Sequence, residues 1–240
     1  MPWPATVLLL IGALAGQPRS DVRFVGQLIV VTTPAWDSVS GTMRRYVRIS
    51  ASSPWRAVGP SVPIVVGQTG LAWGDDALGR PRDPRKREGD GKAPAGRFPL
   101  GATFGFAPRR DAAWVRMPYV PLDDDTECVD DASSLHYNRV LERSSVRRVD
   151  WNSAERMRSI DLYRLGVIVS YNAQPVRRGR GSCIFLHIWR SPTSPTSGCT
   201  AMPASDLETV VRWLDPRLRP QLVQLPAAEY ARLRRAWSLP

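Results

Sequence analysis

The chain has 240 residues, of which 43% are hydrophobic and 23% are charged. This balance suits one globular domain with appendages, and it excludes wholesale disorder. The formal net charge of +11 favours association with a polyanion, but a solvated basic surface is the simpler interpretation. Charge alone does not distinguish nucleic acid, anionic lipid and an acidic wall polymer as the partner.

The N-terminus carries a short apolar run from Thr6 to Ala15 that ends in the small-residue pattern Ala13-x-Ala15. This pattern is typical of a secretory signal peptide, and the run is too short to cross a bilayer as a helix. No Lys or Arg precedes it, so a buried first strand or helix is the alternative. We predict a signal peptide over residues 1–20, cleaved near Ala15. The protein would then be exported to the periplasm or cell wall, with no transmembrane segment after cleavage.

Short runs rich in β-branched and apolar residues follow, with turn residues between them. They predict strands over 27–33, 42–50, 62–66, 98–106, 114–120, 165–171, 183–189 and 221–225. Segments 165–171 and 183–189 are nearly continuous apolar runs, which indicates burial on both faces. Residues 74–99, which follow the strand predicted over 62–66, are crowded with Gly, Pro and charged residues and predict a long surface loop.

Three helices are expected, over 153–162, 205–214 and 227–237. Ser205 is in place to cap the second of them, with Glu208 at the capping-box position. The first strands suggest an antiparallel sheet that begins near the mature N-terminus, and the last helix lies within residues 227–240.

An acidic run spans residues 123–131, which is unusual in so basic a chain. Three interpretations stay open: a loop that pairs with arginines, a cation site, and a site for a substrate amine. The oxygen ligands and turn glycine of a calcium loop are not found at the required spacing.

The chain has three cysteines, Cys128, Cys183 and Cys199. In an exported protein an odd number suggests one disulfide and one free reactive thiol. If Cys199 is the free one, Cys128 and Cys183 are available to pair, although the sequence gives no geometry for the bond.

His187 lies near the end of the apolar segment 183–189, and Cys199 follows it after a loop rich in Ser, Thr and Pro. A neighbouring imidazole activates a thiol as a nucleophile. The backbone amides of Gly198 and Cys199 are candidates for an oxyanion hole, with Gly198 allowing close approach of the backbone. Packing alone is the alternative. Zinc is a weaker one, because the usual paired-ligand spacing is missing.

Four stretches match the motifs of one known family, and they occur in the same order as in that family. They are GQTGLAWG at 67–74, KREGDGKAPAGRF at 86–98, SCIFLHIW at 182–189 and PTSGCTAM at 195–202. The chain resembles the L,D-transpeptidase catalytic domain family (YkuD), and more narrowly its ErfK/YbiS/YcfS/YnhG-like branch. The similarity extends over about residues 28–225. The segments around Cys128, Tyr137 and Asp150 look like further motifs of that branch.

The resemblance implies a mostly β catalytic domain over residues 24–226, a β-sandwich with a few peripheral helices. It also implies that Cys199 is the nucleophile and His187 the base. Thr196 stands where the family has Ser or Thr. Ser197 stands where the family usually has His, and the residues after Cys199 also depart from the usual pattern. The substrate-binding candidates are Thr196, Ser197, Trp189, Asp130, Asp131 and Tyr137.

The implied function is L,D-transpeptidation of peptidoglycan stem peptides through a cysteine thioester, with no metal and no organic cofactor. Two alternatives use the same surface: an L,D-carboxypeptidase with the same thiol, and a wall-binding protein that has lost catalysis. A nucleic-acid binder is favoured only by net charge, and the signal peptide argues against it.

Overall fold

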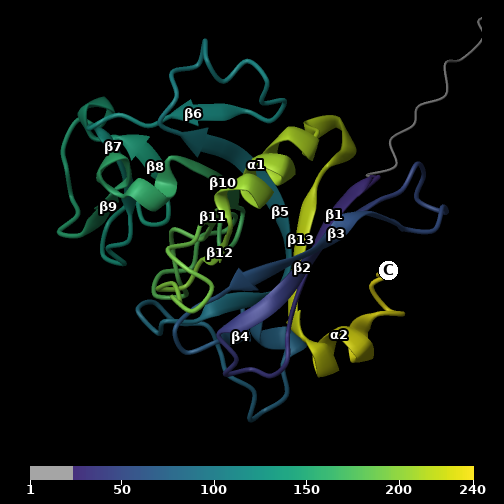
Figure 1. Ribbon diagram of the computed structural model, residues 1–240. Coiled ribbons are helices and arrows are strands. Elements are labelled where there is room, and N and C mark those ends of the chain that lie inside the picture. Colours follow the sequence, from purple (N-terminus) through teal and green to yellow (C-terminus); the bar gives the residue numbers. More distant parts are fainter. Residues whose placement is uncertain (1–23) are drawn as a thin grey trace, which may run out of the picture.

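The computed structural model describes residues 24–240, so the predicted signal peptide lies outside the described residues (Figure 1). Within this range the chain is mostly β, as predicted. The strands are β1 Gln27–Thr33, β2 Ser40–Val47, β3 Arg56–Val65, β4 Leu71–Trp73, β5 Ala93–Gly105, β6 Tyr119–Pro121, β7 Thr126–Val129, β8 Val140–Glu142, β9 Ala154–Arg156, β10 Leu165–Val169, β11 Phe185–Ile188, β12 Thr200–Met202 and β13 Gln221–Pro226. The helices are α1 Ala204–Trp213 and α2 Ala227–Leu233, with short 3₁₀ helices at Asp76–Leu78, Arg143–Ser145, Met157–Ser159, Asp161–Tyr163 and Pro216–Leu218.

The large sheet has the strand order β10-β11-β12-β3-β2-β1-β13-β5-β4, with β6 added on β5. Its hydrogen bonding closes on itself, because β10 pairs with both β11 and β5. The long strand β5 makes this closure possible: residues 96–99 pair with β13, and residues 100–105 pair with β10. The two faces expected of a sandwich therefore belong to one continuous sheet around a shared core.

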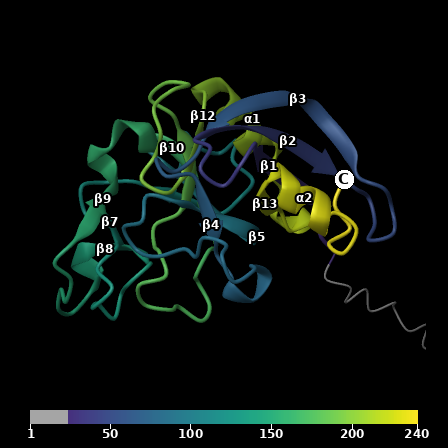
Figure 2. The same cartoon turned by 90° about the horizontal axis from the view of Figure 1, so that it is seen from below.

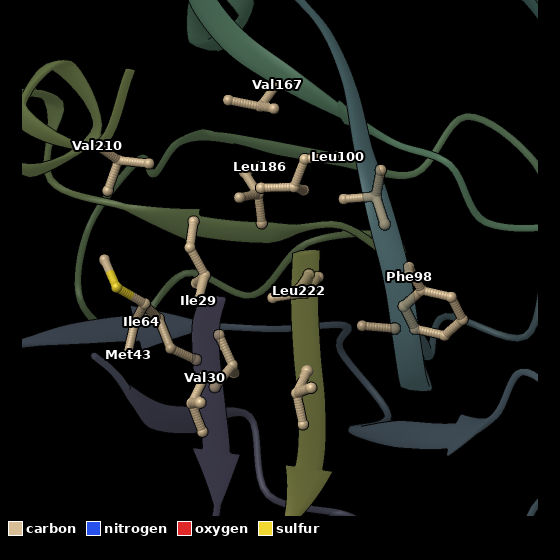
Figure 3. Close-up of a cluster of buried hydrophobic side chains, with 14 of the residues drawn as sticks. Ile29, Val30, Met43, Ile64, Phe98, Leu100, Val167, Leu186, Val210 and Leu222 are labelled. Atoms are coloured by element: carbon tan, nitrogen blue, oxygen red, sulfur yellow. The ribbon is translucent and has the colours of Figure 1, made fainter. Parts of the chain in front are cut away.

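The core lies inside this closed sheet, where apolar side chains of β1, β2, β3, β5, β11 and β13 meet (Figure 3). Strand β1 is buried along most of its length, which explains its almost unbroken apolar sequence. Helix α1 covers the sheet near β10 and β11, to which it presents Leu207, Val210 and Val211. Within residues 24–240, no helix is long and apolar enough to cross a membrane.

A second, three-stranded sheet of order β8-β7-β9 lies to one side of the large sheet, far from α2 (Figures 1 and 2). A separate group of buried side chains joins the two sheets. It includes Phe104, Cys128, Met157, Tyr163, Phe185 and Cys199. The small sheet therefore packs against the segment that carries the candidate nucleophile.

The prediction of a helix over residues 153–162 is wrong. The segment forms β9 and two short 3₁₀ helices, Met157–Ser159 and Asp161–Tyr163. Strand β9 pairs with β7, which places Glu155 opposite Cys128 and holds the backbone extended. Met157 and Tyr163 then turn into the second core. Tertiary pairing overrides a local spacing of apolar residues that is compatible with a helix.

Three other predictions need correction. Helix α1 has Pro203 at its N-cap and begins at Ala204, so Ser205 does not cap it, and Glu208 pairs instead with Arg212 at 2.7 Å. The strand predicted over 114–120 is reduced to β6. The surface loop predicted over 74–99 contains the start of β5 and the buried Lys86, whose Nζ lies 2.6 Å from Asp90 Oδ1. Burying the charged Lys86 is acceptable because that partner is in place.

Replacement of Leu186 by Ala tests this core. The side chain is fully buried on β11, beside the candidate base. We expect the free energy of unfolding to fall by about 2–5 kcal/mol, because the truncation leaves a cavity in a packed interior. Urea unfolding measures this loss, with the exposed Ile49→Ala as the matched control. Equal midpoints for the two variants would contradict the assignment of Leu186 to the core.

Candidate active site

The candidate base lies on β11, and the candidate nucleophile directly precedes the neighbouring parallel strand β12. In the register of β11 and β12, Leu186 is opposite Thr200 and His187 is opposite Ala201, so Cys199 at the entry to β12 lies beside Phe185. Phe185 and His187 are two residues apart and point to the same face of their strand. Both Cys199 and His187 line one cavity of about 650 Å³. The fold therefore brings the two predicted residues into one site.

The Cys199 thiol is buried and held by backbone groups. Its sulfur accepts a hydrogen bond from the Phe185 N–H at 3.3 Å, and the thiol donates to the Cys183 carbonyl at 3.4 Å. Burial raises the pKa of Cys199 far above its ordinary value, and the negative charge of Glu155 adds to the increase. Within residues 24–240, no hydrogen bond joins the sulfur to His187. The resting site thus holds a neutral thiol rather than a thiolate–imidazolium pair.

His187 is held as a neutral imidazole. Its Nδ1 lies 2.8 Å from the Ile188 carbonyl, which assigns the ring proton to Nδ1 and leaves Nε2 as an acceptor. The ring packs edge-on against Tyr163, with 5.2 Å between centroids. Burial lowers the pKa of His187 to about 4. The imidazole is therefore deprotonated at neutral pH, with Nε2 as the acceptor.

This pKa gives a prediction for the pH profile. A general base acts only when deprotonated, so with a pKa near 4 His187 is competent throughout the range from about pH 5 upward. We expect the acid limb of kcat/KM for thioester formation to lie near pH 4. His187→Gln should lower kcat/KM by about 10²–10⁴-fold and remove that limb. An acid limb of the wild type near pH 6.5, the ordinary value of a histidine, would contradict the assignment.

The loop before Cys199 is stabilised by Thr196. Its hydroxyl donates to the Cys199 carbonyl at 2.7 Å and accepts from the Gly198 N–H at 3.1 Å. Gly198 has φ +156°, and a Cβ there would lie 3.1 Å from the Lys92 carbonyl oxygen. Because Thr196 already engages the Gly198 amide, the Cys199 amide is the stronger candidate of the two predicted oxyanion donors, and the role of both amides stays a prediction.

Comparison with known proteins agrees with this geometry. Residues 55–223, more than half of the chain, match the family model of the L,D-transpeptidase catalytic domain, YkuD. The chain belongs to that family. Members of this family are cysteine-nucleophile L,D-transpeptidases of peptidoglycan, and the cysteine is present here as Cys199. The match does not test the narrower ErfK-like branch, which stays a prediction. No curated protein and no solved structure gave a match to the chain.

A disulfide supports the nucleophile of this L,D-transpeptidase domain. Cys128 on β7 and Cys183 are bonded, with an S–S distance of 2.09 Å, and Cys199 is the free cysteine. Cys183 has φ +54°, in the left-handed region that non-glycine residues seldom adopt. Its carbonyl is the one that accepts the Cys199 thiol. The disulfide thus fixes a strained residue that positions the sulfur.

The other predicted site residues divide into two groups. Asp130, Trp189, Thr196 and Ser197 line the cavity with Cys199. Asp131 and Tyr137 do not.

Both residues outside the cavity have structural partners. Asp131 accepts hydrogen bonds from the Ser133 hydroxyl and from the backbone amides of Asn152 and Ser133, and these bonds lower its pKa to about 2. The Tyr137 hydroxyl donates to Glu88 Oε2 and accepts from the Gly181 N–H. We therefore assign Asp131 to loop structure and Tyr137 to the support of Glu88.

Glu155 and Tyr163 also line the cavity, and neither was predicted from the sequence as a site residue. The Tyr163 hydroxyl donates to Glu155 Oε2 at 2.7 Å, and Tyr163 also contacts the Cys199 thiol. Burial raises the pKa of Glu155 to about 7. Glu155 falls in the segment predicted to be helical and Tyr163 directly follows that segment, so their approach to Cys199 depends on the correct pairing of β9 with β7.

Proposed function

We propose that this protein is an exported L,D-transpeptidase that acts on peptidoglycan stem peptides through a thioester on Cys199, and that residues 24–226 form its catalytic domain. The observation that supports this most is a free thiol and a neutral imidazole on adjoining strands, facing one cavity large enough for a peptide segment.

In the first half-reaction the Cys199 sulfur attacks the carbonyl of the amide that precedes the terminal D-alanine. The thiol proton passes to His187 Nε2 as the carbon–sulfur bond forms. The Cys199 N–H stabilises the negative charge that develops on the carbonyl oxygen. The imidazolium then returns its proton to the departing amine of D-alanine, which leaves a thioester and a neutral base.

In the second half-reaction an amine of a neighbouring stem attacks the thioester and His187 accepts its proton. The carbon–sulfur bond breaks, the thiol regains a proton, and the two stems are joined by a new amide. If water attacks in place of the amine, the product is a free carboxylate and the enzyme is a carboxypeptidase. Two departures from the usual motif, Ser197 and Ala201, line the cavity, and this supports a role for them in the choice between these acceptors.

Export is part of the proposal. The disulfide between Cys128 and Cys183 supports it, because structural disulfides persist in oxidising compartments such as the periplasm and are rare in the cytosol.

The test is incubation of the protein with purified disaccharide-tetrapeptide, followed by product masses. We expect dimers that have lost one alanine. Loss of alanine without dimers would replace transpeptidation by carboxypeptidation with the same thiol. A protein that shows neither product and forms no thioester would overturn the proposed enzyme and favour a wall-binding protein.

A further inference from the structure

A second cavity, of about 490 Å³, lies on the small sheet and shares no lining residue with the catalytic cavity. Two segments form most of it: the turn that leads into β8, and the loop that follows the 3₁₀ helix Arg143–Ser145. Its polar lining consists of His136, Arg139, Ser145, Arg147 and Arg148. None of the described residues that line it is acidic, so we call it the basic cavity.

The three arginines of the basic cavity have no partner of their own. Within residues 24–240, the side chains of Arg139, Arg147 and Arg148 form no hydrogen bond, ion pair or ring contact, and all three are exposed. Arg143, in the 3₁₀ helix directly before the loop, is different, because its Nη1 lies 3.2 Å from Glu127 Oε2. Three unpaired like charges around one cavity repel one another, and an anion that binds between them removes this repulsion.

The imidazole of His136 is a fourth group with free hydrogen-bonding capacity. In the described part of the chain neither of its ring nitrogens has a hydrogen-bond partner, and Nδ1 is buried. The ring packs edge-on against Trp151, with 5.5 Å between centroids. The charge of Asp150 interacts with His136, but the Asp150 oxygens already accept from Ser134 Oγ at 2.6 Å and from the Leu135 N–H at 2.9 Å. A polar ring atom without a partner marks a place where a ligand or water completes the hydrogen bonding.

The number and spread of these donors favour a tetrahedral oxyanion over a carboxylate. One guanidinium fork is enough to satisfy both oxygens of a carboxylate. A phosphate group presents at least three strong acceptor oxygens, so it is able to accept from donors on two separate segments at once. The volume of the basic cavity is also within the range of small-molecule sites, which leaves room for the group that carries the phosphate.

We propose that His136, Arg139, Arg147 and Arg148 form a binding site for a phosphate group. The site is separate from the cavity of Cys199, so it stands whether or not the proposed function is correct. It gives the formal charge of +11 a definite place of action, since the net charge alone attracts any polyanion. A phospholipid headgroup and a free phosphate compound share this chemistry, and the experiments below distinguish them.

The first experiment titrates the protein with inorganic phosphate and follows the histidine Cε1–H resonances by NMR. The chain has two histidines, His136 and His187, so each resonance is assigned from the spectrum of His136→Gln. We expect the His136 signal to shift saturably and the signal of the catalytic-cavity His187 to stay in place. Succinate, at the same pH and ionic strength, should give no saturable shift. No shift with phosphate, or an equal saturable shift with succinate, would overturn the proposal.

Charge-neutral variants test the arginines. The double variant Arg147→Gln/Arg148→Gln should raise the Kd for inorganic phosphate by about tenfold or more, because it loses charge-assisted hydrogen bonds. Arg139→Gln, on the other segment, should raise it independently. The matched control is Arg44→Gln, an exposed arginine of β2 outside the basic cavity, which should keep the wild-type Kd. All of these side chains are exposed, so the urea midpoints should stay close to that of the wild type.

Vesicle sedimentation identifies the source of the phosphate. The vesicles are phosphatidylcholine with and without phosphatidylglycerol. Sedimentation with phosphatidylglycerol that the double variant loses and Arg44→Gln keeps would support the site and assign it to a lipid headgroup. Saturable binding of inorganic phosphate without sedimentation would support the site and assign it to a free phosphate compound. If the double variant matches Arg44→Gln in both measurements, net charge alone explains any binding and the proposal is overturned.

Discussion

Replacing Cys199 by Ala is expected to abolish thioester formation and to reduce turnover of the stem peptide by about 10⁴-fold or more. Cys199 is the free cysteine of the described chain, and it lines the cavity together with His187. No other thiol there is available to carry the acyl group, because Cys128 and Cys183 are joined to each other. The measurement is intact mass during turnover, where the wild type gains the mass of the acyl donor.

The fold should survive this substitution, which makes the result easy to interpret. The thiol makes two hydrogen bonds with backbone groups, and Ala leaves only a small space in a packed region. Circular dichroism and urea unfolding of Cys199→Ala check this. An acyl adduct on a well-folded Cys199→Ala protein would show that another residue is the nucleophile and would refute the assignment.

The motif-bearing parts of the site were predictable from the sequence because their signals are local. The buried segment that contains His187 and the Gly198-Cys199 pair are contiguous stretches, and the register of β11 with β12 brings them together as the resemblance implied. The mostly β fold was predictable for the same reason, since runs of β-branched and apolar residues mark most strands.

The remaining wall of the cavity was not predictable, because it depends on long-range pairing. Glu155 faces the cavity only because β9 pairs with β7, and its local spacing of apolar residues favoured a helix instead. Asp130 and Asp131 are neighbours in an acidic run, yet only Asp130 lines the cavity. From the sequence, both were predicted to bind substrate. The fold decides which of two adjacent carboxylates points into the cavity, and the sequence pattern does not show this.

Removal of the disulfide by the double substitution Cys128→Ala/Cys183→Ala is expected to lower the free energy of unfolding by about 4 kcal/mol. The bond closes a loop with a sequence separation of 55 residues, and this is the magnitude that loss of unfolded-state entropy predicts for such a loop. Urea unfolding of the variant and of the oxidised wild type measures the difference. Reduced wild type, prepared with dithiothreitol, should resemble the variant.

The same change should also slow thioester formation at temperatures where the variant remains folded. Cys183 keeps a left-handed backbone, and its carbonyl accepts the Cys199 thiol, so freeing its side chain loosens the group that orients the nucleophile. A matched control is Ser182→Ala, the preceding buried residue, whose hydroxyl contacts Glu88 rather than the thiol. The unfolding midpoint of Ser182→Ala should lie closer to that of the wild type than to that of the double cysteine variant.

Equal midpoints for oxidised and reduced protein would refute a stabilising role of the bond. A loss of about 4 kcal/mol is a large share of the 5–15 kcal/mol that stabilises a typical domain. The consequence concerns the compartment in which the enzyme works. Because the disulfide joins β7 of the small sheet to the segment that leads into β11, a reducing compartment would weaken the fold and the active site together. Full activity is therefore expected only after export to an oxidising environment.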